Sequence, residues 1–289
     1  MRKLILYARM MGKLLKKETV TAWEVAEAYD QIADSYQDWS NCMGSYLEQI
    51  FPDSIQGPDH PTFLDLACGS GDVSARLLDR YPKSTVVAVD LSSGMLEKAK
   101  SRLGESRVRF VHQDAASFLR ETREPFDGVW IGWAYPYIKN AFLLRSLNPV
   151  IKPGGVLGII SNRKGTLKGI IQSYQKVMER FPHQVVKPMD THWNLPRLTL
   201  NSDRMKQAGF RVIKEGIGAH PVCFPTPEQL VDWVQRTGAV AGTRKIFRHF
   251  NPQIQQALRD EVARRCSCAE GYGTSHWFVY GLFAKEGTQ

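Results

Sequence analysis

Two glycines and two carboxylates fall close together in residues 63–74, which read Phe-Leu-Asp-Leu-Ala-Cys-Gly-Ser-Gly-Asp-Val-Ser. Alternating apolar residues end at small ones, Gly69 and Gly71 follow, and a helical apolar pattern begins at Val73, which predicts a strand, a tight turn and a helix start. Glycines let a ligand approach the backbone closely. Asp65 and Asp72 would repel a pyrophosphate at this helix N-terminus and favour a ligand that carries an ammonium or sulfonium group. The alternative is a glycine turn in an ordinary α/β core.

Further acids end the next two predicted strands. Asp90 ends the apolar strand 85–90 and lies 19 residues after Gly71, where a carboxylate can accept hydrogen bonds from both hydroxyls of a ribose. A turn then leads into a helix predicted over 95–103, and Asp114 ends the strand predicted within 107–115. The carboxyl ends of parallel strands meet at one edge of a sheet, so these acids are expected to lie together.

The same stretches resemble the ordered motifs of the class I S-adenosylmethionine (SAM)-dependent methyltransferases. Asp65-Leu-Ala-Cys-Gly-Ser-Gly71 resembles motif I, Asp90-Leu-Ser-Ser-Gly-Met-Leu96 resembles the second motif, and Leu147-Asn-Pro-Val-Ile-Lys-Pro-Gly-Gly155 resembles the turn before the fifth strand. The resemblance implies SAM as cofactor and S-adenosylhomocysteine as product. It also implies that Leu91 and Met95 flank the adenine and that Asp114 accepts a hydrogen bond from the adenine amino group. The implied cofactor-binding residues are Asp65, Ala67, Gly69, Gly71, Asp90, Leu91, Met95, Asp114, Ala115 and Gly132.

The resemblance also implies the fold that positions these residues. In that family it is a Rossmann-like, doubly wound α/β fold with a seven-stranded sheet in the order 3-2-1-4-5-7-6, in which strand seven is antiparallel. Here the fifth strand is expected over 156–161 and the last over 276–283. We expect a helical N-terminal lid over 1–60 and a methyltransferase core over 61–289. Insertions at about 162–200 and 225–273 would leave the carboxyl ends of strands and cap the active face.

Aromatic residues are the main candidates for the acceptor side. Tyr29 and Tyr36 stand in Ala28-Tyr-Asp-Gln-Ile-Ala-Asp-Ser-Tyr-Gln-Asp38, which resembles a Tyr-Asp-x-x-Ala-x-x-Tyr signature of small-molecule methyltransferases. They either pack on the core or face cofactor and acceptor. Trp133 and Tyr137 replace the Asn/Asp-Pro-Pro-Tyr/Phe motif of enzymes that methylate exocyclic or amide nitrogens, a departure that counts against such acceptors. They offer apolar walls with polar edges.

Charged and titratable residues near the predicted cap complete the candidate site. His192 is the preferred candidate for a general base, ahead of His183 and His220, although a packing or solvated role fits each of the three. Arg163 follows strand five and can hold an acidic group of the substrate or remain surface charge. Trp193, next to His192, is placed in the substrate pocket. No metal site is predicted, since Cys266 and Cys268 are too closely spaced for a usual zinc pair.

The net charge of +9 is concentrated at the start of the sequence. Residues 1–17 contain six Lys or Arg and no acid, which leaves +3 for the rest of the chain. A nucleic-acid groove would need basic residues spread across the fold, so nucleic acid is an unlikely partner. Leu4, Ala8, Met11 and Leu15 recur at helical spacing, with basic residues on the opposite side. This segment is expected to be a lid over the domain or, alternatively, a peripheral contact with an anionic membrane.

Together these features predict methyl transfer from SAM to a small aromatic or apolar metabolite, on O, N or C. The motif set most resembles methyltransferases of ubiquinone and menaquinone biosynthesis and relatives that modify natural products in secondary metabolism. The five scattered cysteines are read as reduced thiols of a cytoplasmic protein, either a monomer or a homodimer. Two alternatives remain open: an RNA or protein methyltransferase, and a SAM-dependent protein that does not methylate, such as a cyclase.

Overall fold

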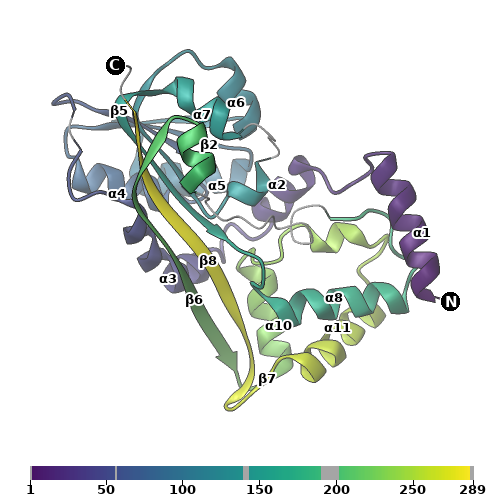
Figure 1. Cartoon of the computed structure of the whole chain (residues 1–289). Coiled ribbons are helices and arrows are strands. Elements are labelled where there is room, and N and C mark those ends of the chain that lie inside the picture. Colours follow the sequence, from purple (N-terminus) through teal and green to yellow (C-terminus); the bar gives the residue numbers. More distant parts are fainter. Residues whose placement is uncertain (1, 56, 139–142, 190–201, 287–289) are drawn as a thin grey trace.

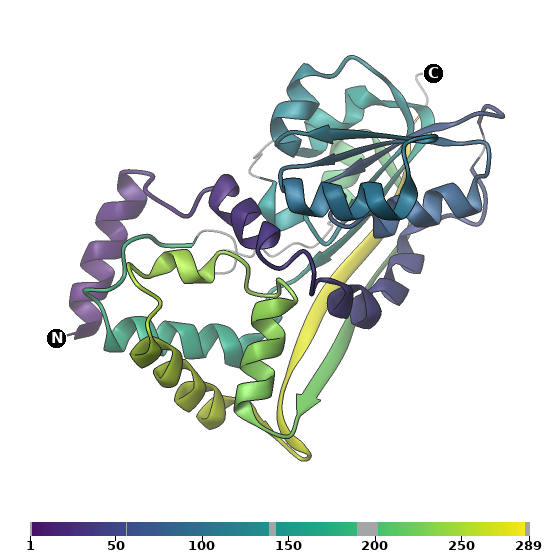
Figure 2. The same ribbon diagram turned by 180° about the vertical axis from the view of Figure 1, so that it is seen from behind.

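Seven strands of a computed structural model form one mixed sheet in the order β3-β2-β1-β4-β5-β8-β6 (Figures 1 and 2). The structure describes residues 2–55, 57–138, 143–189 and 202–286. Strands β1 to β5 are parallel, and β8 runs antiparallel to both β5 and β6. The predicted order is therefore confirmed, with β8 in the place of the seventh strand. The strands are β1 (Thr62–Leu66), β2 (Thr85–Asp90), β3 (Val108–His112), β4 (Phe126–Gly132), β5 (Ile151–Asn162), β6 (Phe210–Phe224), β7 (Ser267–Cys268) and β8 (Gly271–Lys285).

The parallel strands are buried on both faces, because helices cover each side of the sheet. Along β2, Val86 and Ala88 belong to one hydrophobic cluster, while Val87 and Val89 belong to another. This alternation follows from the two-residue period of a strand. Helices α4 (Asp72–Arg80) and α5 (Ser93–Leu103) pack on the first face, and α6 (Ala115–Glu121), α7 (Leu143–Leu147) and α9 (Ser202–Gln207) pack on the second.

Two strands are longer than the sequence predicts. Strand β5 begins at Ile151 and passes through Gly154 and Gly155, where the predicted turn becomes a register shift against β4. Strand β8 begins at Gly271 instead of at residue 276, so the second insertion ends earlier than expected. Beyond its pairing with β5, β8 continues with β6 as a two-stranded ribbon that reaches the helices of the insertions (Figure 1). Along this ribbon Val222, Phe224 and Tyr272 are half-buried and pack against the core, whereas Trp277 is exposed.

The insertions form a second helical layer beside the sheet. It contains α8 (Lys168–Arg180), α10 (Pro227–Arg236), the short 3-10 helix η4 (Thr243–Ile246) and α11 (Pro252–Arg265). Helix α8 packs along α11, and α10 contacts α11, β6 and β8. The buried side chains of this layer continue the cluster on the first face of the sheet. Only the parts of the insertions within the described ranges are included in this description.

Three short helical segments precede the sheet. They are α1 (Arg2–Leu15), α2 (Ala22–Asp30) and α3 (Gln37–Met43), followed by the 3-10 helix η1 (Gly44–Ile50). The predicted capping box starts α2: the Thr21 hydroxyl accepts a hydrogen bond from the Glu24 N–H, and the Glu24 carboxylate accepts one from the Thr21 N–H. Helix α1 packs on α8, away from the strand ends.

Candidate functional site

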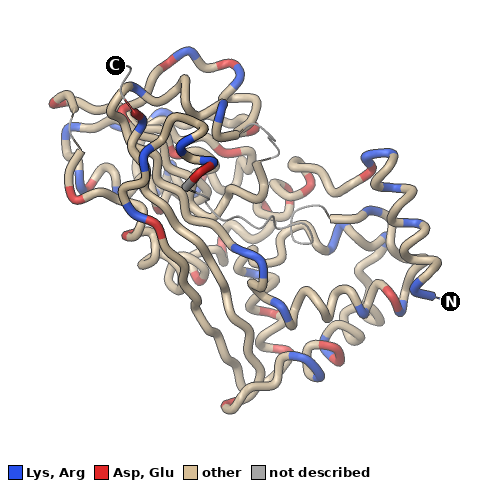
Figure 3. Tube along the Cα trace, viewed as in Figure 1, with Lys and Arg blue, Asp and Glu red and all other residues tan. Residues whose placement is uncertain are grey.

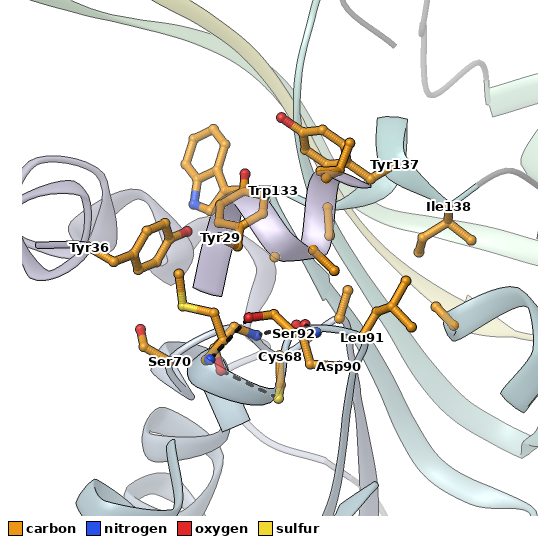
Figure 4. A pocket seen from close by; sticks show the side chains of 18 of the residues that line it. Tyr29, Tyr36, Cys68, Ser70, Asp90, Leu91, Ser92, Trp133, Tyr137 and Ile138 are labelled. Atoms are coloured by element: carbon orange, nitrogen blue, oxygen red, sulfur yellow. Dashed lines mark hydrogen bonds between the residues drawn. The ribbon is translucent and has the colours of Figure 1, made fainter. Parts of the chain in front are cut away.

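A deep cavity opens at the carboxyl ends of β1, β2, β3 and β4. Its empty volume is about 1220 Å³ including the mouth, and its walls combine these strand ends with residues from α2, α3 and the loops around them. Figure 4 shows Asp90, Leu91 and Cys68 on one side and the rings of Tyr29, Tyr36 and Trp133 across from them. The strand–turn–helix units set this location, because each parallel strand delivers its following loop to the same edge of the sheet.

The two glycines of the turn after β1 lie in different environments. Gly69 has φ +54° and lines the cavity, and a Cβ added there would meet nothing within 4 Å. Gly71 has φ +82° and does not line the cavity, and a Cβ there would lie 2.8 Å from Leu103 Cδ1. Gly69 therefore leaves open space for a ligand, whereas Gly71 allows α4 to begin close against α5. The structure thus shows a packing role for Gly71, and its predicted contact with the cofactor stays a prediction.

Asp65 is a fully buried carboxylate at the floor of the cavity. Its Oδ2 accepts hydrogen bonds from the Ser74 N–H at 2.9 Å and from the Ser74 hydroxyl at 2.6 Å. Its Oδ1 is buried and has no hydrogen-bond partner in the protein. Loss of hydration raises the pKa of Asp65 to about 7, although the Ser74 hydrogen bonds act in the opposite direction. An unpartnered carboxylate oxygen beside a cavity suits a cationic ligand group.

Asp90 organises two loops at the end of β2. Its Oδ2 accepts a hydrogen bond from the Gly69 N–H and its Oδ1 accepts one from the Ser92 N–H, each at 2.8 Å. Burial raises the pKa of Asp90, and backbone hydrogen bonds at Ser92, Gly69 and Leu91 oppose that rise. Each carboxylate oxygen keeps a further lone pair for a ligand hydroxyl. Asp90 thus fixes the glycine turn and presents an acceptor to the cavity.

The remaining predicted cofactor residues lie around the same wall. Asp114 lines the cavity but also caps α6, since its Oδ2 accepts hydrogen bonds from the Ser117 N–H and hydroxyl. One of its two oxygens is therefore committed to the helix N-terminus, so only the other matches the predicted adenine role. The cavity lining includes Ala67, Leu91, Met95, Ala115 and Gly132.

The second acid of the motif is already paired. Asp72 lines the cavity, and its Oδ1 accepts a hydrogen bond from Arg102 at 2.6 Å. The Ser40 hydroxyl of α3 also donates to its carboxylate. Arg102 therefore offsets the negative charge of Asp72.

Tyrosine and tryptophan side chains from three separate segments form an aromatic wall. The ring of Tyr29 packs edge-on against Tyr36 and Tyr137, with centroids 5.9 Å and 6.1 Å apart. Trp133 lies 5.7 Å from Trp39 in the same T-shaped manner. All five line the cavity (Figure 4 shows four of them). Edge-to-face packing holds such rings in fixed orientations.

The hydroxyls of this wall are uncharged at physiological pH. Burial raises the pKa values of Tyr29, Tyr36 and Tyr137 above that of free tyrosine. Tyr29 also donates a hydrogen bond to the Gly238 carbonyl at 3.4 Å, which ties α2 to the second insertion. The wall therefore offers polar hydroxyls but no phenolate.

Several sequence-predicted residues are not brought to this site. Arg163 lies outside the cavity lining, where its guanidinium stacks 5.9 Å from the centre of the Trp277 ring. His183 is exposed, and the half-buried His220 has Nδ1 3.1 Å from the Tyr46 hydroxyl; neither lines the cavity. His192 and Trp193 lie outside the described residues.

The cavity also contains residues that sequence reasoning missed. Trp39 and Leu47 come from α3 and η1, Val20 and Val25 from the start of α2, and Met189 from the first insertion. Their sequence signal is only an apolar residue at helical spacing, which is typical of any core. Within the segment 1–60 predicted as a lid, residues between 20 and 47 line the cavity and none from α1 does; its role as a lid stays a prediction.

Comparisons with known proteins agree with this architecture. Residues 63–155 match a family model described as a methyltransferase domain, which confirms the resemblance indicated by the motifs. A demethylmenaquinone methyltransferase of Leptospira interrogans is 31% identical over 160 residues, 51% of this chain and 64% of the relative. A malonyl-[acyl-carrier protein] O-methyltransferase of Geobacter sulfurreducens is 24% identical over 264 residues, 90% of this chain and 97% of the relative. The chain thus spans less than two thirds of the length of the Leptospira relative.

Solved structures show the same fold. A methyltransferase-like protein from Bacillus halodurans superposes with a TM-score of 0.54 at 20% identity and covers 84% of this chain and 98% of its own. Phosphoethanolamine N-methyltransferase 2 of Haemonchus contortus, solved with S-adenosyl-L-methionine, gives a TM-score of 0.51 at 18% identity and covers 90% of this chain and 57% of its own.

Proposed function

We propose, from the premise that residues 63–155 form a methyltransferase domain, that this chain transfers a methyl group from SAM to a small, uncharged, apolar or aromatic acceptor. The observation that carries the proposal is the cavity at the ends of β1 to β4, which Asp65 and Gly69 line and in which Asp90 lies across from a wall of aromatic rings (Figure 4). The acidic side suits the cofactor and the aromatic side suits the acceptor.

The residues present fit the cofactor. SAM supplies an activated methyl group on a positively charged sulfur, with a good leaving group. The unpartnered Oδ1 of Asp65 and the open space beside Gly69 suit the cationic methionine end. Asp90 would accept hydrogen bonds from the ribose hydroxyls, and Leu91 and Met95, which line the same cavity, would bracket the adenine. These assignments rest on the family resemblance together with the positions of the side chains along one wall.

The chain contributes mainly orientation and the exclusion of water. The aromatic wall holds an acceptor across the cavity from the cofactor site, which lowers the entropic cost of bringing the two together. Its tyrosine hydroxyls stay protonated, so they do not remove protons from the acceptor. His192, outside the described residues, remains our candidate base for an acceptor that loses a proton.

The charge of the lining selects among acceptors. Among the described residues, no Lys or Arg lines the cavity. A free carboxylate would enter without a cationic partner, and such a group costs several kcal/mol to desolvate. This disfavours a malonyl-type acceptor and favours an aromatic ring such as a demethylmenaquinone presents. The surface charge outside residues 1–17 likewise gives little support to a nucleic-acid substrate.

Product analysis with two matched acceptors tests the proposal. Purified protein is incubated with SAM and either a reduced naphthoquinone or a malonyl thioester, and products are quantified by mass spectrometry. We expect S-adenosylhomocysteine and a methylated ring product from the first acceptor, and background levels from the second. Methylthioadenosine as the main product would indicate a cyclase, and preferred methylation of the thioester would refute the argument from charge.

A further inference from the structure

Helix α1 carries an apolar stripe that the rest of the protein leaves exposed. Its members recur at the spacing of one helix face. Leu4 is 76% exposed, Leu15 is 79% exposed, and Tyr7 and Met11 are each 54% exposed. Leu14, at 38%, borders the same stripe. Isolated exposed leucines are ordinary, but five large apolar residues on one face of a single helix form a contiguous patch.

The opposite part of α1 fixes its orientation on the protein. Leu6 is 3% exposed and belongs to the hydrophobic core, and Met10 packs against that core. The Arg9 guanidinium donates a hydrogen bond to the Val185 carbonyl at 3.4 Å. Helix α1 is held against α8 by these contacts, so the stripe points away from the protein. In both views α1 lies at the outer edge of the molecule (Figures 1 and 2).

Basic residues accompany the stripe along the whole helix. Residues 1–17 contain six Lys or Arg and no acid, and Figure 3 shows this run of positive charge at the edge of the molecule. Lys13 pairs with Glu18, whereas Arg2, Lys3, Lys16 and Lys17 project into solvent. Lys3 Nζ lies 5.8 Å from the centre of the ring of Tyr7, a member of the stripe, and Lys16 and Lys17 directly follow Leu15 at its end. The Debye length at physiological salt is about 8 Å, so a surface that contacts the stripe feels these charges.

We propose that α1 docks on an anionic lipid surface. Leu4, Met11 and Leu15 enter the boundary between headgroups and acyl chains, while Lys3, Lys16 and Lys17 contact lipid phosphates. Net positive charge combined with one apolar face is the pattern of an interfacial helix. A planar surface also suits a helix on a protruding edge, because the patch is a ridge and not a groove. None of the helices in the described parts of the chain has the length and apolar content to cross a bilayer.

Sedimentation with lipid vesicles tests the proposal without using enzymatic activity. The full chain is mixed with vesicles of phosphatidylcholine alone or of phosphatidylcholine with phosphatidylglycerol. We expect at least about tenfold stronger binding to the anionic vesicles, since each basic residue near such a surface contributes about 1 kcal/mol. High salt should reverse most of this gain.

Paired variants separate the apolar and the electrostatic contributions. Leu4→Glu with Leu15→Glu should reduce binding to background, and Lys16→Glu with Lys17→Glu should reduce it by about tenfold or more. Ile217→Glu is the matched control, because Ile217 is 65% exposed on β6 and receives the same chemical change far from α1. The control should bind as the wild type does. Near-ultraviolet circular dichroism checks that each variant is folded.

Three results would overturn the proposal. The first is equal binding to neutral and anionic vesicles, and the second is unchanged binding of both double variants. The third is a wild-type dimer that ignores vesicles and becomes a monomer in the Leu4→Glu, Leu15→Glu variant, measured by analytical ultracentrifugation. That result would assign the stripe to a second copy of this chain.

Discussion

Asp65 should make the stability of the protein fall as the pH rises from about 4 to 7. Burial raises its folded-state pKa to about 7 from a model-compound value of 3.8. Between these values the folded state holds a proton that the unfolded state has released, so each pH unit of increase lowers the free energy of unfolding by about 1.4 kcal/mol. Between pH 5 and pH 8 the loss amounts to about 3 kcal/mol. Well above pH 7 the carboxyl is ionised in both the folded and the unfolded state, so it lowers the free energy of unfolding no further.

The variant Asp65→Asn isolates this effect from other titrating groups. Its amide oxygen can still accept both hydrogen bonds from Ser74, and its side chain does not ionise. Denaturant unfolding of the wild type and the variant at pH 5 and pH 8 gives the change in the free energy of unfolding with pH for each protein, and the difference between these two changes is the contribution of Asp65. We expect the wild type to lose about 3 kcal/mol relative to Asp65→Asn over this interval. Equal pH dependence in the two proteins would refute the assignment of a raised pKa to Asp65.

The same carboxylate should link cofactor binding to pH. A cationic ligand group beside Asp65 favours its ionised form, so binding should release a proton below pH 7. The affinity for SAM, measured by calorimetry in two buffers of different ionisation enthalpy, should rise with pH up to about 7 and then level off. If the affinity for SAM stays constant from about pH 5.5 to about pH 8, the cationic group of the ligand does not lie beside Asp65.

Other predictions follow from the same wall and its neighbours. Asp90→Ala should weaken S-adenosylhomocysteine binding by at least about 100-fold, because two hydrogen bonds to a charged acceptor are lost; calorimetry that gives wild-type affinity would remove the ribose assignment. Gly71→Ala should lower the free energy of unfolding by about 2–4 kcal/mol, since φ is +82° and the new Cβ meets Leu103 at 2.8 Å. The matched change Gly69→Ala should cost only about 1–2 kcal/mol of stability, and chemical denaturation that ranks the two in the reverse order would contradict the packing argument. Tyr137→Phe should raise the acceptor KM by about three- to tenfold and leave the affinity for S-adenosylhomocysteine unchanged. Steady-state kinetics measures the first quantity and calorimetry the second, and an unchanged KM would contradict a role for Tyr137 on the acceptor side.

The sequence predicted the cofactor side of the cavity because that side is built from local units. Each strand, turn and acid lies within about a dozen residues, and the parallel arrangement brings their ends together. Asp65, Gly69, Asp90, Leu91 and Met95 all line the cavity as expected. Gly71 was placed there too, but backbone conformation alone does not reveal whether a glycine faces a ligand or a neighbouring helix.

The acceptor side depends on contacts between distant segments, which local patterns do not encode. Trp39 and Met189 meet the strand ends only after α2, α3 and the insertions have packed on the sheet. Arg163 follows strand five, near the strand ends in sequence, yet its guanidinium stacks on Trp277 of the neighbouring strand β8.

By itself, the sequence of this protein determined the glycine turn and the acids at the ends of β1, β2 and β3, since short-range periodicity and turn chemistry are sufficient for these, and the order of the strands followed from the family resemblance of those motifs. The tertiary structure alone decided which aromatic rings face the cofactor site, which acid is neutralised by Arg102, and which face of α1 is covered. These are outcomes of packing between remote segments, and packing selects one arrangement among several that the local patterns allow equally well.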